Sequence, residues 1–223
     1  MKVIIAGATG AAGREAVNFS LSEDRITKVV LLTRKSLPSD ITRNPKVEVV
    51  MHDDFSNYPA SVLDKLKGAE ACVWAIGGRV DQFNGDKEMC RKVNVTFTLA
   101  AAKAMQEAIA EPSPTGKLRF VFCSGLYTEW DQDKKLYFLN DSRKIKGEVE
   151  KGLSDIADAH PDRFEAFFLR PGGFMEPDAG IVKRALGTLY VTTPTPQLGK
   201  ALVKVAMNGW KDRTIENPEI LGM

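Results

Sequence analysis

The 223 residues suit one α/β domain with a sizeable core and are few for two domains. The net charge is only +2 and Lys and Arg are spread out, which gives no indication of nucleic acid or an anionic membrane as a partner. The 3 cysteines and 2 histidines lack disulfide or metal spacing, so we expect reduced core cysteines and no metal. No segment approaches the ~20 apolar residues of a membrane span. The apolar run at 3–6 is too short for a secretory signal, so we expect a cytoplasmic protein.

A glycine-rich turn at 7–13 follows that first apolar run and precedes a helical pattern through Val17, Phe19 and Leu21. Glycines let a backbone turn tightly and approach a pyrophosphate, while the amide groups and dipole of the following helix attract negative charge. We therefore predict a dinucleotide cradle, with an ordinary strand–helix turn as the alternative. The predicted contacts are Gly7, Thr9, Gly10, Ala11, Ala12 and Gly13.

Strand and helix patterns alternate along the whole chain. This alternation predicts a Rossmann-like, doubly wound α/β fold with a parallel sheet and helices on both faces. We expect a single NAD(P)-binding domain, residues 1–223, with a small substrate-side portion at about 171–223. The pattern also predicts a loop at 37–46 and one long helix over 86–110, whose apolar stripe passes through Cys90, Val93 and Phe97. It further predicts a short helix at 178–187 and a short strand at 189–192.

The end of the second predicted strand, 28–32, bears on the choice between NAD and NADP. An NAD site places an acidic residue here to bind the ribose hydroxyls. This chain has Thr33 instead, followed by Arg34 and Lys35. A planar guanidinium and a neighbouring ammonium suit the 2′-phosphate of NADP(H), which we predict as the cofactor. Solvated loop charges are the alternative.

The fourth predicted strand, 71–76, ends in two glycines. Glycine at the carboxyl end of a central strand lets a cofactor lie close to the backbone, in the crevice where such sheets bind ligands. We therefore predict cofactor contacts at Ile76, Gly77 and Gly78, with a plain turn as the alternative.

Several motifs follow one another in a recognisable order: glycines spaced Gly-x-x-Gly-x-x-Gly, the Thr-Arg-Lys run, Ser124, Lys-Gly-Glu-Val-Glu at 146–150 and Arg-Pro-Gly at 170–172. Together they resemble the atypical short-chain dehydrogenase/reductases. The similarity extends to the small NmrA-like proteins and the family of the human Tat-interacting protein of 30 kDa. This resemblance covers most of the chain and implies an NAD(P)H-binding Rossmann fold and an oxidoreductase acting on a small organic substrate.

The resemblance implies roles for three residues in the first half of the chain. Asp54 and Phe55, which follow the strand predicted at 47–51, would flank the adenine. An aspartate here also suits a helix-entry turn. Asn94, within the long helix, would brace the active-site loop or simply face solvent.

Two later positions are also implied by the resemblance. Ser124, after the strand predicted at 118–123, would be the active-site hydroxyl that binds a substrate carbonyl, and ending the strand is its alternative role. The segment after the strand at 164–169 would pass the nicotinamide and contact its carboxamide through the backbone. Its residues are Pro171, Gly172, Gly173 and Phe174.

The helix after Ser124 departs from the family pattern. These reductases present Tyr-x-x-x-Lys, in which the tyrosine is the acid or base and the lysine binds the nicotinamide ribose. Here Lys146 is present, but Ser142 stands four residues before it. A serine hydroxyl is a far poorer acid than a phenol of pKa ~10. We therefore consider Tyr127, Tyr137 or water as the proton source, and a solvated charge remains the alternative for Lys146.

Three functions follow from these residues. The first is NADPH-dependent reduction of a small molecule, in which a conjugated double bond or an imine demands less of the missing tyrosine than a ketone does. The second is a non-catalytic module that senses NADP(H) or binds a protein partner, with a homodimer also possible. The third is an isomerase or dehydratase that reuses the pocket with Glu129 or Asp131 as a base.

Overall fold

The computed structural model describes residues 1–109, 116–176 and 191–223. In these residues, seven parallel strands form one sheet in the order β3-β2-β1-β4-β5-β6-β9, and β7 pairs with β8 in a separate sheet. The strand order reverses between β1 and β4, which confirms the predicted Rossmann-like, doubly wound fold. The large sheet contains β1 (Lys2–Ala6), β2 (Lys28–Thr33), β3 (Val47–Met51), β4 (Ala71–Trp74), β5 (Leu118–Cys123), β6 (Phe164–Arg170) and β9 (Thr214–Glu216). The small one contains β7 (Gly173–Met175) and β8 (Thr192–Pro194).

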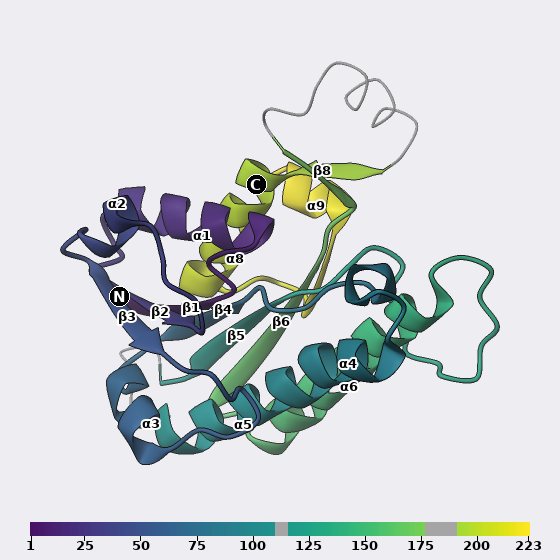
Figure 1. Ribbon diagram of the computed structural model, residues 1–223, viewed down its shortest axis with the longest axis horizontal. Coiled ribbons are helices and arrows are strands. Elements are labelled where there is room, and N and C mark those ends of the chain that lie inside the picture. The colour runs from purple at the N-terminus through teal and green to yellow at the C-terminus, as the bar shows by residue number, and fades with distance from the viewer. Residues whose placement is uncertain (110–115, 177–190) are drawn as a thin grey trace.

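Helices cover both faces of the large sheet, as Figure 1 shows. On one face lie α1 (Ala11–Ser22), α8 (Thr195–Asn208) and α9 (Asn217–Leu221). On the other lie α3 (Ala60–Leu66), α4 (Lys87–Arg91), α5 (Phe97–Ile109) and α6 (Asn140–Ala159). No helix among the described residues is both long and apolar enough to cross a membrane.

The central strands are apolar on both sides because helices cover both sides. In β1, alternate side chains point to opposite faces, so that Ile4 joins one core while Val3 and Ile5 join the other. These three side chains are fully buried. Each such burial contributes about 1.5–3 kcal/mol of hydrophobic free energy, which fixes the register that places the strand ends side by side.

Local predictions needed correction at three points. The loop predicted at 37–46 contains a short helix, α2 (Ser39–Thr42), and the strand predicted at 71–76 already ends at Trp74. The strand predicted at 189–192 is found as β8, which begins only at Thr192, although residues 189–190 lie outside the described residues. The helix predicted at 178–187 also lies outside them.

The single helix predicted over 86–110 is interrupted by a π-helical turn, η2 (Lys92–Thr96), between α4 and α5. A π turn adds a residue to the helical repeat and so rotates the following side chains. The predicted stripe passed through Val93, but it is Asn94 and Val95 that are buried. The rotation directs a polar side chain into the protein at a point that a regular helix would fill with an apolar one.

The carboxyl-terminal residues contribute to the main sheet, which the pattern of the short tail did not indicate. Helix α8 packs closely against α1, since a Cβ on Gly199 would lie only 2.5 Å from the Glu15 backbone. Strand β9 pairs with β6 at the edge of the sheet. The separate substrate-side portion at about 171–223 stays a prediction, and among the described residues only β7 and β8 stand apart from this sheet.

Candidate functional site

The turn after β1 has a geometry that only glycine allows at two positions. Gly7 has a φ of +92°, and a Cβ there would lie 2.6 Å from the carbonyl oxygen of Ala75, beyond the end of β4. A Cβ on Gly13 would lie 2.1 Å from the Gly7 carbonyl oxygen. Helix α1 then begins at Gly10 with no side-chain cap and no acidic residue in its first turn, within the described residues. Its amide groups and dipole therefore favour an anionic ligand, and the turn fits a dinucleotide pyrophosphate.

At the end of β2, two cations are presented to solvent. Thr33 is buried, and its hydroxyl both accepts from the Lys35 amide and lies 3.0 Å from the Lys35 carbonyl oxygen, which fixes the turn. Arg34 and Lys35 are exposed, and no ion pair of either side chain is found within the described residues. Both cations are thus available for a phosphate, although their role stays a prediction.

The two residues predicted to flank the adenine differ in their environment. Asp54 is exposed, and its carboxylate accepts a hydrogen bond from the Ser56 amide at 3.0 Å, as a turn-forming aspartate does. The Phe55 ring is buried against Trp74 and Phe97, with ring centroids 5.9 and 6.0 Å away. Its ring belongs to the core, so Asp54 and the backbone remain as the predicted adenine contacts.

Beyond β4, Gly77 and Gly78 are fixed by the asparagine on the π turn. Asn94 is fully buried, accepts from the Gly78 amide at 3.2 Å and donates to the Gly78 carbonyl at 3.1 Å. Gly77 has a φ of +140°, and a Cβ there would lie 2.4 Å from the Asn94 Oδ1 and 3.1 Å from the Lys146 Nζ. Asn94 therefore does not face solvent. The π turn directs its side-chain amide at the loop after β4, which Asn94 braces.

Lys146 reaches the carboxyl ends of the central strands from α6. Its Nζ donates to the Cys123 carbonyl at 3.2 Å and lies 4.5 Å from the centre of the Phe122 ring. Burial lowers the pKa of the ammonium below its usual value, against the opposing effect of Cys123, Cys90 and Glu150. Lys146 is thus not a solvated helix charge; it lies beside Gly77 at the carboxyl ends of the central strands, where open α/β sheets bind ligands in a crevice.

The position that the family gives to tyrosine is filled and closed. Ser142 is buried, and its hydroxyl accepts a hydrogen bond from the Val80 amide at 3.0 Å. Val80 begins a 3₁₀ turn, η1 (Val80–Phe83), so the Ser142 hydroxyl is bonded to the start of this turn. The serine holds a loop in place and does not itself face the crevice as an acid.

Ser124 lies at the end of β5, but its hydroxyl is bonded inside the protein. It donates to Glu150 Oε1 at 2.6 Å, and Glu150 is fully buried. Glu150 also accepts from the indole of Trp130 at 2.7 Å and from both Nε and Nη2 of Arg170. A donor to a substrate carbonyl, the predicted role of Ser124, would have to give up the bond to Glu150.

The Glu150–Arg170 pair was missed by the sequence reasoning, although both residues lie in motifs that carried the resemblance. Glu150 ends Lys-Gly-Glu-Val-Glu and Arg170 begins Arg-Pro-Gly. The available signal was a carboxylate directly after Val149, on the apolar face of α6. A carboxylate at such a position requires a buried cation, and Arg170 is that cation.

The two tyrosines considered as proton sources are far from buried. Tyr137 is fully exposed, at 106% of its reference area, and Tyr127 is 58% exposed with its ring 5.7 Å from the Arg143 guanidinium. Figure 1 shows the segment between β5 and α6, which carries both, as a loop that projects beyond the start of α6. The structure does not bring either phenol into the crevice.

The segment after β6 has its first polar groups already bonded. The Pro171 carbonyl accepts from the Leu126 amide at 2.8 Å, and the Gly172 amide donates to the Thr193 hydroxyl at 2.8 Å. The Gly173 amide donates to the Val191 carbonyl at 2.9 Å. Phe174 is 49% exposed. The two amides therefore have no proton left for a carboxamide, whereas the Pro171 carbonyl keeps a second lone pair.

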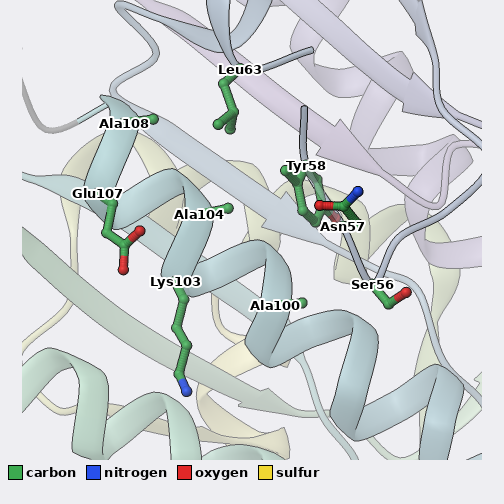
Figure 2. A pocket seen from close by; sticks show the side chains of 9 residues that line it. All are labelled: Ser56, Asn57, Tyr58, Leu63, Ala100, Lys103, Ala104, Glu107 and Ala108. Carbon is green, nitrogen blue, oxygen red and sulfur yellow. The ribbon is translucent and has the colours of Figure 1, made fainter. Parts of the chain in front are cut away.

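A separate open pocket of about 430 Å³ lies between α3, α5 and the segment after β3 (Figure 2). Tyr58 and Leu63 form its apolar part, and Figure 2 shows the side chains of Lys103 and Glu107 directed away from them. None of the predicted cofactor or catalytic residues lines it. The pocket is therefore distinct from the crevice that contains Lys146.

Comparison with known proteins agrees with this geometry. A model of the NAD(P)H-binding family matches residues 7–205, from the glycine turn to α8. Leucinostatins biosynthesis cluster protein T of Purpureocillium lilacinum is 39% identical over 77 residues, which cover 34% of this chain and 28% of that protein. The alignment thus spans less than a third of the length of this relative.

Solved structures share the fold at low sequence identity. Yeast Gre2, a methylglyoxal/isovaleraldehyde reductase complexed with NADPH, has a TM-score of 0.74 at 16% identity, over 97% of this chain and 78% of its own. DesIV of Streptomyces venezuelae, a dTDP-glucose 4,6-dehydratase with NAD bound, has a TM-score of 0.70 at 15% identity, over 100% and 79%. The PhqB reductase domain of Penicillium fellutanum has a TM-score of 0.66 at 13% identity, over 96% and 66%. Such identities establish the fold alone.

Proposed function

Because the chain belongs to the NAD(P)H-binding family, we propose that it is an NADP(H)-dependent oxidoreductase acting on a small organic substrate. One observation carries this proposal. The partly buried Lys146 ammonium lies at the carboxyl ends of β4 and β5, beside Gly77 and 3.2 Å from the Cys123 carbonyl. A lysine held in that crevice, close to the glycine turn that contacts Ala75, is of use to a bound nucleotide and contributes little to a core.

The chain offers a group for each part of the cofactor. The turn at 7–13 would hold the pyrophosphate, Arg34 and Lys35 the 2′-phosphate, Asp54 the adenine and Lys146 the nicotinamide ribose. When bound, NADPH supplies a hydride. We also propose that the chain is related to the small NmrA-like proteins and to the family of the Tat-interacting protein of 30 kDa. The order of its motifs along the sequence supports this relationship.

Lys146 is also our choice for the group that donates a proton or hydrogen bond to the substrate. Ser142 is bonded to Val80, and Tyr137 is exposed on a projecting loop. The lowered pKa of the Lys146 ammonium makes it a stronger acid than an ordinary lysine. A substrate that needs little acid catalysis, such as a conjugated double bond or an imine, suits this site best.

A second candidate is a non-catalytic module that senses NADP(H), alone or with a protein partner. The closed position of Ser142 favours it, because the chain uses that residue to hold η1 and not to protonate a substrate. The isomerase or dehydratase has less support. Glu129 is paired with Lys134 at 2.6 Å, and the exposed Asp131 accepts from the Asp133 amide at 2.9 Å.

Titration of NADPH and NADH into the purified protein, followed by nicotinamide fluorescence, tests the cofactor proposal. We expect NADPH to bind at least about tenfold more tightly, as charge-assisted bonds to a phosphate are worth ~1.5–3 kcal/mol. Arg34→Ala should remove most of that preference. Arg43→Ala is the matched control, because Arg43 is an exposed arginine at the end of α2, outside the run that follows β2.

The outcomes separate the candidates. If neither nucleotide binds, the cofactor proposal is wrong. If NADPH binds tightly but is not consumed with a panel of enones, imines, aldehydes and ketones, the non-catalytic module is favoured. Steady consumption with any of them establishes the oxidoreductase.

A further inference from the structure

The hydroxyl proton of Ser124 has a fixed destination. Glu150 is fully buried, and its two oxygens accept two bonds from the Arg170 guanidinium and one from the Trp130 indole. In this ion pair the carboxylate acts as an acceptor. Ser124 has one proton, and its oxygen lies 2.6 Å from Glu150 Oε1. The neighbouring Thr128 hydroxyl lies farther from the Ser124 oxygen, at 3.1 Å, and itself donates to the Gly125 carbonyl at 2.7 Å. The shorter, charge-assisted bond to Glu150 therefore takes the Ser124 proton. What Ser124 retains for a ligand is therefore lone pairs: it can accept a hydrogen bond but not donate one.

Ser124 also lies beside the segment that follows β6. Its amide donates to the Leu169 carbonyl at 2.8 Å, two residues before Pro171. In that segment the Pro171 carbonyl and the amides of Gly172 and Gly173 already have partners in the protein. Ser124 thus offers a hydrogen-bond acceptor next to a segment whose first two amides are already bonded.

We propose that Ser124 binds the carboxamide of the nicotinamide, accepting a hydrogen bond from its NH₂ group, and does not polarise a substrate carbonyl. This rests on the proposed cofactor site. The carboxamide is a donor that every NAD(P) molecule carries, whereas a carbonyl substrate offers Ser124 only a second acceptor. Glu150 is then a positioning residue, because it acts on the cofactor through the orientation of the Ser124 hydroxyl. Holding the carboxamide fixes the rotation of the nicotinamide ring and hence the face that meets the substrate.

Calorimetric titration with three oxidised nucleotides tests this directly. NADP⁺ carries the NH₂ group, its acetylpyridine analogue has a methyl group instead, and its thionicotinamide analogue keeps the NH₂. We expect wild-type protein to bind NADP⁺ and the thionicotinamide analogue alike, and the acetylpyridine analogue about fivefold more weakly, as for one lost hydrogen bond. Ser124→Ala should bind all three alike, while Ser124→Thr should keep the discrimination.

Ser154→Ala is the matched control, because Ser154 is a buried serine on α6 whose hydroxyl has no partner among the described residues. It should discriminate as wild type does. If Ser124→Ala still discriminates against the acetylpyridine analogue, or if wild type never does, Ser124 does not bind the carboxamide and the proposal is overturned. If wild type binds no nucleotide at all, the cofactor proposal fails together with this one. One set of titrations thus distinguishes failure of the carboxamide proposal from failure of the cofactor proposal.

Discussion

The two sides of the crevice are built in different ways. On the side of β1 and β2, the candidate site is backbone: a glycine turn, an uncapped helix start and two exposed cations. On the side of β5 and β6, it is a buried network of side chains in which Ser124, Glu150, Arg170 and Trp130 bond to one another. The first side is suited to a ligand that many proteins share, and the second is specific to the side chains of this chain.

This difference separates binding from chemistry. A backbone cradle binds a pyrophosphate whatever the side chains nearby, because its donors are amide groups. Proton transfer depends on one group with a suitable pKa, and Ser142 stands where the resemblance to short-chain reductases implies a tyrosine. The side chains near β5 and β6 therefore decide whether a bound nucleotide reacts.

The largest effect on stability is expected from Glu150→Gln, in the buried side-chain network beside β5 and β6. The change leaves the Arg170 guanidinium, whose side chain is only 17% exposed, without its buried carboxylate. Removing one partner of a buried ion pair typically costs about 3–5 kcal/mol of unfolding free energy. Urea unfolding measures it.

Glu148→Gln is the control. Glu148 lies on the surface of α6 and pairs with Arg91 of α4, and loss of such a surface pair costs about 0–1 kcal/mol. Equal losses for the two variants would show that the buried network contributes no more than a surface pair. A double variant, Glu150→Leu with Arg170→Met, should recover much of the loss because no buried charge is left unpaired. Glu216, which also pairs with Arg170, is 46% exposed and can be solvated.

In the glycine turn after β1, Gly13→Ala is expected to have the next largest effect on stability. The added Cβ would lie 2.1 Å from the Gly7 carbonyl oxygen, so the turn must open. We expect a loss of about 1–3 kcal/mol in stability and a larger loss of NADPH affinity. Gly10→Ala is the matched control: its Cβ meets the same oxygen at 3.4 Å, and both measurements should change little. Similar NADPH affinities for the two variants would contradict the cradle.

Lys146 lies at the carboxyl ends of β4 and β5, between these two parts of the site. Its contribution to folding stability depends on pH. Burial lowers the pKa of the folded ammonium, so the folded chain binds that proton less readily than the unfolded chain does. The resulting destabilisation is present at neutral pH. It diminishes as pH rises through the lowered pKa toward ~10.4, the ordinary lysine value.

Lys146→Met should therefore be more stable relative to wild type at neutral pH than at about pH 10. Urea unfolding at both pH values checks this, with Lys151→Met, an exposed lysine of the same helix, as the control. A difference between Lys146→Met and wild type that does not change with pH would contradict a buried ammonium.

The sequence was sufficient to predict those structural features that depend on a local pattern of residues. The parallel sheet, the glycine turn and the apolar face of α6, with Val149 and Leu153, are set by periodicity and by glycine spacing. It was insufficient where distant residues meet. The bond between Asn94 and Gly78 depends on a π turn, and the pair of Glu150 with Arg170 depends on the contact of α6 with β6. The position of Glu150 on the apolar face of α6 signals a buried partner, but no local pattern identifies Arg170 as that partner or places the π turn.

The smallest effect is expected from Tyr137→Phe, and it sharpens the comparison because it concerns the missing acid. The Tyr137 side chain is fully exposed, so removing its hydroxyl should change stability by less than about 0.5 kcal/mol and leave any NADPH-dependent turnover within about twofold. Initial rates with the best substrate of the panel measure the second quantity. A large drop in turnover with unchanged nucleotide binding would mean that the projecting loop closes over the crevice during catalysis. The chain would then have replaced its missing helical tyrosine with one carried by that loop, and Lys146 would return to holding the ribose alone.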